Sequence, residues 1–262
     1  MKMRPSRVLE KLRRGEIASC TKMNTSDTRV VDIAAMSGVD CVWLCQEHTG
    51  NTLNDIENQI RAAKVFDVDT IVRVQRGNYS NLIRPLELDA SGIMVPHLMS
   101  AQEGRDIVRW TRFAPVGRRP IDGGNADGLY CQLSGEDYLR GANRERMLIV
   151  QIEDPEPLDE LEEIASIEGI DMLFFGPGDF SHAIGVPFQM NHPKVVEVRR
   201  RVAKAALDHG KFAGTVASPD SIDELIDMGY RFLNIGADVL ILSEGFNKVA
   251  EAFRNAKKPQ AR

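Results

Sequence analysis

The sequence has 262 residues, of which 43% are hydrophobic and 27% charged, with a net charge of −5 and a pI near 5.6. This composition is typical of a folded soluble protein and excludes a fibrous or disordered chain. The acidic balance, without an extended basic block, argues against a nucleic-acid partner. No run of 18 apolar residues predicts a membrane span, and the four cysteines lack metal-binding or redox spacing, so we expect a cytoplasmic protein.

Short runs rich in β-branched residues alternate with longer amphipathic runs along the whole chain. This alternation is typical of βα units that build a parallel sheet. The predicted strands are Ile17 to Thr21, Cys41 to Cys45, Thr70 to Val74, Gly92 to Pro96, Met147 to Glu153, Asp171 to Gly176, Lys211 to Val216 and Arg231 to Gly236. Eight such units without a linker predict a single domain over residues 1–262, an α/β (β/α)8 TIM barrel.

The ends of several helices can be predicted from polar residues and glycines. Thr52 precedes a helical apolar pattern, while Gly38, Gly210 and Gly229 follow predicted helices. Residues 113–146 interrupt the βα pattern with two prolines and a glycine pair. A connection of that length is usually functional or disordered, so we expect an irregular segment there.

In a barrel of this kind the active site lies at the carboxyl ends of the strands. Glu153 ends one predicted strand and Asp179 follows the next, so their carboxylates can converge. Two oxygen ligands with several open positions suit a hard cation such as Mg²⁺ or Mn²⁺. The alternative is that each acid caps a local helix or turn.

Two further features favour an anion at this end of the barrel. Arg73 lies in an otherwise apolar strand, where burial requires a carboxylate partner, either from a ligand or from an internal acid such as Glu87. The turn at residues 176–179 offers the backbone N–H groups of Gly178 and Asp179 to an anion, although such a turn is also ordinary turn chemistry.

Histidines supply the candidates for a general base. His48 follows the second predicted strand in a polar loop, where a pKa near neutrality would serve proton transfer. A solvated loop histidine is the alternative interpretation. His97, directly after the fourth predicted strand, is a second candidate for the same end of the barrel.

These segments resemble a known family. Gln151-Ile152-Glu153, followed by Gly176-Pro177-Gly178-Asp179-Phe180-Ser181, is similar to paired motifs of the HpcH/HpaI family of metal-dependent (class II) pyruvate aldolases. That family includes aldolases of the 2,4-dihydroxyhept-2-ene-1,7-dioate and 2-keto-3-deoxy-sugar-acid type. The resemblance extends over nearly the whole chain, through residues 46–48, 71–73, 92–96 and 234–238.

The resemblance implies cleavage of a 4-hydroxy-2-oxoacid to pyruvate, or a related 2-oxoacid, and an aldehyde through a metal-bound enolate. It implies a (β/α)8 barrel and a homo-oligomer, a hexamer or trimer of dimers, in which the C-terminal helix at residues 239–256 is exchanged between subunits. The implied site comprises metal ligands for Mg²⁺, Mn²⁺ or Co²⁺ (Glu153 and Asp179), substrate-binding residues (Arg73, Gln151, Gly178, Asp179 and Thr215) and catalytic residues (Arg73 and His48).

Two alternatives to this mechanism remain open, and the first comes from a departure from the family. Cys45 stands where many members have an aspartate three residues before the histidine, and a neutral thiol orients a base less well. On the first alternative, this change disables the base, and the chain is a non-catalytic or altered family member that binds a metal and a 2-oxoacid. A Schiff-base aldolase would instead need a lysine at a strand end, for which Lys22 is the best candidate.

Overall fold

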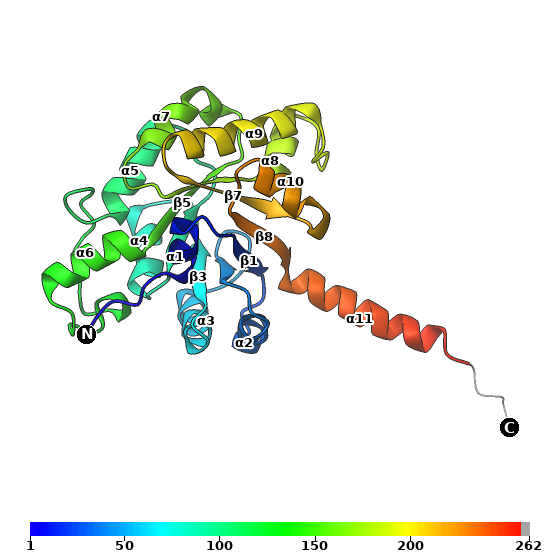
Figure 1. Ribbon diagram of the computed structural model, residues 1–262. Helices are drawn as coiled ribbons and strands as arrows, with labels where there is room; N and C mark the ends of the chain where they lie inside the picture. Colours follow the sequence, from blue (N-terminus) through cyan, green and yellow to red (C-terminus); the bar gives the residue numbers. More distant parts are fainter. Residues whose placement is uncertain (258–262) are drawn as a thin grey trace.

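The computed structural model describes residues 1–257 and contains a closed barrel of eight parallel strands in sequence order (Figure 1). The strands are β1 (Ala18–Met23), β2 (Cys41–Cys45), β3 (Asp69–Arg73), β4 (Gly92–Val95), β5 (Met147–Ile152), β6 (Met172–Phe175), β7 (Phe212–Ala217) and β8 (Phe232–Ala237). Each pairs with the next, and β8 closes the barrel on β1. The predicted barrel is confirmed, and every strand end lies within two residues of its predicted position.

Most of the helices surround the barrel. The helices are α1 (Arg7–Arg13), α2 (Thr28–Met36), α3 (Leu53–Val65), α4 (Tyr79–Glu87), α5 (Ala101–Thr111), α6 (Gly135–Glu145), α7 (Leu161–Ser166), α8 (Pro177–Ala183), α9 (Pro193–Asp208), α10 (Ile222–Asp227) and α11 (Asp238–Arg254), with short 3₁₀ helices η1 (Ala126–Gly128), η2 (Glu156–Glu160) and η3 (Pro219–Ser221). Within residues 1–257 no helix is both long and apolar enough to cross a bilayer.

The predicted helix ends are confirmed at particular residues. Thr52 and Asp55 form a capping box at the start of α3. Gly38, Gly210 and Gly229 have φ values of 90°, 66° and 102°, the left-handed conformation that glycine adopts without steric strain where a helix ends.

Side chains along each strand point alternately to its two faces, and this separates two apolar cores. One face of each strand packs against the surrounding helices, and the other fills the barrel interior with side chains such as Trp43, Ile71 and Phe174. Val8 and Leu9 of α1 belong to the interior cluster, so this helix closes the amino end of the barrel. Polar side chains that point inward are therefore presented at the opposite, carboxyl end of the strands.

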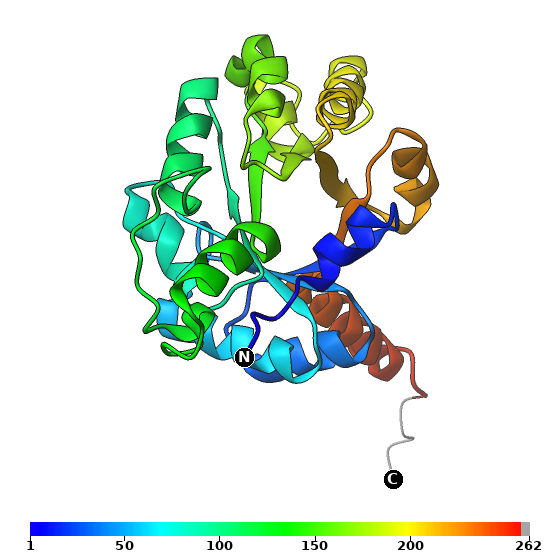
Figure 2. The ribbon, with the colours of Figure 1, turned by 60° about the vertical axis from the view of Figure 1, so that its left-hand side comes forward.

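Residues 113–146 are more ordered than the sequence predicts. They contain η1 and α6, and the rings of Phe113 and Tyr138 pack edge to face with centroids 5.1 Å apart. Buried Asp127 accepts hydrogen bonds from Tyr138 and Arg119. The expectation of an irregular segment holds for residues 113–125 and 129–134 and is wrong for residues 135–145, which form α6. The segment connects an α-helix to a β-strand and packs against the chain's N-terminal segment through Met3 (Figure 2).

The last helix projects away from the barrel (Figure 1). Its exposed apolar side chains include Leu240, Phe246, Val249 and Phe253, with exposed fractions of 58%, 70%, 57% and 79%. At the base of α11 a cavity of about 500 Å³ opens beside β1, β8 and α2, lined mainly by apolar side chains. Both surfaces are of the kind that a protein partner covers.

Candidate active site

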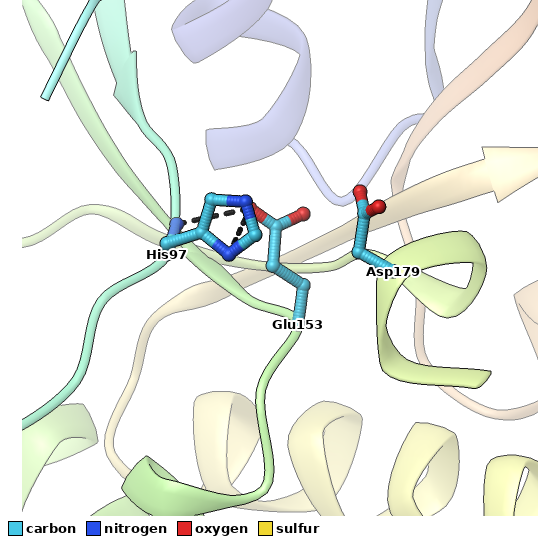
Figure 3. A group of neighbouring side chains, drawn as sticks. All are labelled: His97, Glu153 and Asp179. Carbon is cyan, nitrogen blue, oxygen red and sulfur yellow. Dashed lines mark hydrogen bonds and ion pairs between the residues drawn. The ribbon is translucent and has the colours of Figure 1, made fainter. Parts of the chain in front are cut away.

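Three side chains from separate elements meet at the carboxyl end of the barrel. Glu153 directly follows β5 and is 1% exposed, Asp179 lies in the first turn of α8, and His97 follows β4. A ring nitrogen of His97 and one carboxylate oxygen from each acid all lie within 4.8 Å of one another (Figure 3). The structure thus brings together the two acids that the sequence singled out, and adds a histidine.

Glu153 is held by a hydrogen bond to each oxygen. The backbone N–H of His97 donates to Oε1 at 2.9 Å, and the side-chain amide of Gln151 donates to Oε2 at 2.8 Å. Burial raises the pKa of the Glu153 carboxyl to about 7, and the nearby Asp179 adds to this effect while the hydrogen bond from His97 opposes it. A buried carboxylate with a raised pKa favours a cation beside it.

Gly176 is required by the position of Glu153. A Cβ atom at residue 176 would lie 2.3 Å from Glu153 Oε2 and 2.8 Å from its Cβ, closer than real contacts allow. The glycine lets the chain from β6 into α8 pass against the glutamate. The Gly-Pro-Gly-Asp turn therefore positions Asp179 next to Glu153.

Arg73 points into the barrel at the end of β3 and is 4% exposed. Its Nε forms an ion pair with Glu47 Oε2 at 2.9 Å, its Nη2 donates to Cys45 Sγ at 3.3 Å, and its guanidinium lies 4.7 Å from the centroid of Trp43. The internal acid proposed from the sequence, Glu87, is not the partner. Glu87 is the last residue of α4, which runs antiparallel to the strands and ends at the amino side of the barrel.

Glu47 links the basic groups at this end of the barrel. Besides Arg73, its carboxylate lies 3.3 Å from Nε2 of His48 and 3.7 Å from Nε2 of His97. His48 is 55% exposed, and its backbone N–H donates to the buried Cys45 Sγ at 3.5 Å. The carboxylate beside His48 thus belongs to Glu47.

His97 has a carboxylate partner of its own. Its Nδ1 lies 2.7 Å from Oδ2 of Asp154, and its φ of 50° is unusual for a residue other than glycine. Burial lowers the pKa of His97, but the hydrogen bond to Asp154 and the charges of Asp154, Glu153 and Glu47 outweigh it, so the pKa is raised overall. The sequence identified His97 only as a second candidate base and placed Asp154 at the end of the fifth strand without a role. Each is the second residue after the end of its strand.

Lys22 and Thr215, two other residues that the sequence singled out, do not contact the Glu153 and Asp179 carboxylates by any hydrogen bond or ion pair found among the described residues. Burial, followed by the charge of Arg73, lowers the pKa of Lys22, whose Nζ is 5.5 Å from the Trp43 centroid. The Thr215 hydroxyl donates to the carbonyl of Phe175 at 2.9 Å. Its neighbour Val216 packs with the barrel interior, so the Thr215 side chain faces the surrounding helices.

Gly178 and Asp179 occupy the first turn of α8, after Pro177. Backbone N–H groups in the first turn of a helix have no acceptor within the helix. These are the two amides that the sequence offered to an anion.

The comparisons with known proteins agree with this geometry. The model of the HpcH/HpaI aldolase/citrate lyase family matches residues 23–244. The 2-keto-3-deoxy-L-rhamnonate aldolase of Escherichia coli strain K12 is 29% identical over 249 residues, covering 95% of this chain and 93% of the relative.

Solved structures give the same picture. An HpcH/HpaI aldolase from Desulfitobacterium hafniense DCB-2 superposes with a TM-score of 0.88 at 25% identity, covering 96% of this chain and 98% of the other. The citrate synthase SbnG superposes with a TM-score of 0.86 at 25% identity, covering 94% and 96%.

Fold and site therefore define a (β/α)8 barrel enzyme of the carbon–carbon lyase class. The chain belongs to the HpcH/HpaI aldolase/citrate lyase family, as its motifs predicted. The match favours aldolase activity over a non-catalytic binding protein or a Schiff-base enzyme.

Proposed function

We propose that the protein is a divalent-metal-dependent class II aldolase that cleaves a 4-hydroxy-2-oxoacid to pyruvate, or a related 2-oxoacid, and an aldehyde. The observation that carries this proposal is the convergence of Glu153 and Asp179 within 4.8 Å at the carboxyl end of the barrel. The relatives named as aldolases support it.

The donor set fits a divalent cation. Glu153 and Asp179 supply carboxylate oxygens, the ligands that Mg²⁺ and Mn²⁺ prefer. Gln151 holds Glu153 in place from its other side, as residues around metal ligands commonly do. When bound, the cation supplies electrophilic stabilisation of the negative charge that develops on the 2-oxo oxygen during cleavage.

The chain's own residues account for the remaining steps. Arg73, in the inner wall of the barrel, binds the substrate carboxylate, and the amides of Gly178 and Asp179 add hydrogen bonds. His48 accepts the proton of the 4-hydroxyl, the C3–C4 bond breaks, and its electron pair passes toward the 2-oxo group as the aldehyde leaves. Glu47, 3.3 Å from Nε2 of His48, stabilises the protonated imidazole in place of the aspartate that Cys45 replaces.

We also propose that the protein acts as a homo-oligomer in which α11 covers a neighbouring subunit. The apolar residues exposed on α11 and the apolar cavity beside β1 and β8 are complementary in character. A hexamer, or trimer of dimers, satisfies both surfaces. Light scattering should give a monomer for a Leu240→Glu, Phe246→Glu double variant and an oligomer for Lys248→Glu; a monomeric wild type contradicts the proposal.

Proton NMR of pyruvate in D₂O tests the aldolase proposal without knowledge of the aldehyde. Methyl exchange should require a divalent cation, disappear with chelator and return with Mn²⁺ or Mg²⁺. Glu153→Gln should abolish exchange, whereas Glu156→Gln, the same change at an exposed position nearby, should not. Bound pyruvate without metal-dependent exchange would contradict the proposal.

A further inference from the structure

His97 is placed by an unusual backbone conformation. Its φ of 50° lies in the left-handed region, which carries a cost for a residue with a side chain, and such positions often serve a site. In this conformation the backbone N–H of His97 reaches Glu153 Oε1 at 2.9 Å. The main chain and the ring of His97 therefore both lie against the same carboxylate.

The ring has the environment of a metal-binding histidine. Its Nδ1 is 2.7 Å from Asp154 Oδ2 and 3.8 Å from Glu153 Oε1. A carboxylate accepts hydrogen bonds but donates none when ionised, so Nδ1 carries a proton, and in the neutral imidazole Nε2 holds the lone pair that a cation binds. Histidines that bind metals typically donate the other ring N–H to a carboxylate in this way.

The spacing of the ligand atoms suits one ion. A ring nitrogen of His97 lies within 4.8 Å of carboxylate oxygens of both Glu153 and Asp179 (Figure 3). Two ligands that bind one ion at about 2.1 Å lie at most about 4.2 Å apart. Three ligands cannot all be trans to one another, so at least two of the pairs must approach to about 3.0–3.4 Å. The ligand atoms therefore move toward the ion by about an ångström when it binds.

We propose that His97 is a third protein ligand of the cation held by Glu153 and Asp179, with Asp154 orienting its imidazole. This inference rests on the proposed function of the site. An imidazole ligand raises affinity for Mn²⁺, Co²⁺ and similar transition ions relative to Mg²⁺, which prefers oxygen ligands. The site therefore selects a transition-metal ion over Mg²⁺.

Pulsed electron paramagnetic resonance of the Mn²⁺-loaded full-length protein tests the bond itself. The wild type should show ¹⁴N coupling from one directly bound imidazole, and His97→Gln should lose it. His182→Gln, a change at an exposed histidine on the same helix as Asp179, should retain it. Absence of nitrogen coupling in wild type overturns the proposal, because a histidine that only contacts a metal-bound water lacks this signal.

Calorimetric titration of the same proteins with Mn²⁺ and Mg²⁺ tests the selectivity. His97→Gln should weaken Mn²⁺ binding about 10- to 100-fold while changing Mg²⁺ binding by less than about 3-fold. His97→Asp, which places an oxygen ligand on a residue that tolerates the left-handed backbone, should bind Mg²⁺ more tightly than His97→Gln does and show no nitrogen coupling. Equal losses for both ions contradict the proposal.

Failure of the proposed function is distinguishable from failure of this inference. If Glu153→Gln leaves Mn²⁺ affinity unchanged, the metal site itself is refuted. If Mn²⁺ binding depends on Glu153 but not on His97, only the histidine ligand is refuted.

Discussion

The buried carboxyl of Glu153 makes the stability of the metal-free protein depend on pH. Its pKa is about 7 in the folded protein against an ordinary 4.5, mainly because of burial. Between these values the folded state keeps a proton that the unfolded chain has released, so the free energy of unfolding falls as the pH rises. The pKa shift corresponds to a decrease of about 3 kcal/mol in the free energy of unfolding, which is complete above pH 7.

Glu153→Gln removes this ionisation while keeping the size of the side chain. Without metal, the variant should be more stable than wild type by up to about 3 kcal/mol at pH 8, and nearly equal at pH 5. Saturating Mn²⁺ should stabilise wild type at pH 8 and have little effect on the variant. The measurement is urea unfolding with chelator from pH 5 to 8 at one protein concentration.

The control is Glu156→Gln, which should match wild type throughout because that side chain is exposed. A stability difference between wild type and Glu153→Gln that stays constant from pH 5 to 8 would refute the reasoning, since it would arise from packing rather than ionisation. Equal stability at pH 8 would refute it as well.

Three further predictions concern the same end of the barrel. Gly176→Ala places a Cβ 2.3 Å from Glu153 Oε2 and should weaken Mn²⁺ binding at least 10-fold by calorimetry, whereas Gly178→Ala, with open space around its Cβ, should not; equal affinities would contradict this. Arg73→Lys keeps the charge but loses the planar fork, and should weaken pyruvate binding about 10-fold with Mn²⁺ binding retained; unchanged pyruvate affinity would exclude a bidentate contact. Borohydride with pyruvate should leave Lys22 unmodified by mass spectrometry, and a covalent adduct would revive the Schiff-base mechanism.

Much of the fold followed from local pattern. Strands such as Cys41 to Cys45 and helix ends such as Gly38 depend on residues close in sequence, so periodicity and capping predicted them. Glu153 and Asp179 were also predictable, because parallel strands in a barrel present their carboxyl ends on one side.

The partners of these residues required the tertiary structure. The sequence alone did not assign Glu47 rather than Glu87 to Arg73, because the direction in which α4 returns along the barrel decides which acid is near. Residues 113–146 were predicted to be irregular for a similar reason, since the structure within this segment is stabilised by packing against the distant N-terminal segment.

His97 shows the division most clearly. Its position after a strand indicated the right end of the barrel, but its ring meets Asp154 and Glu153, which are 57 and 56 residues away along the chain. The sequence by itself determined the barrel, its family and the two acids at its open end. Which histidine and which carboxylates surround those acids was decided by tertiary structure, because contacts between residues distant in sequence depend on how separate strands close into one barrel.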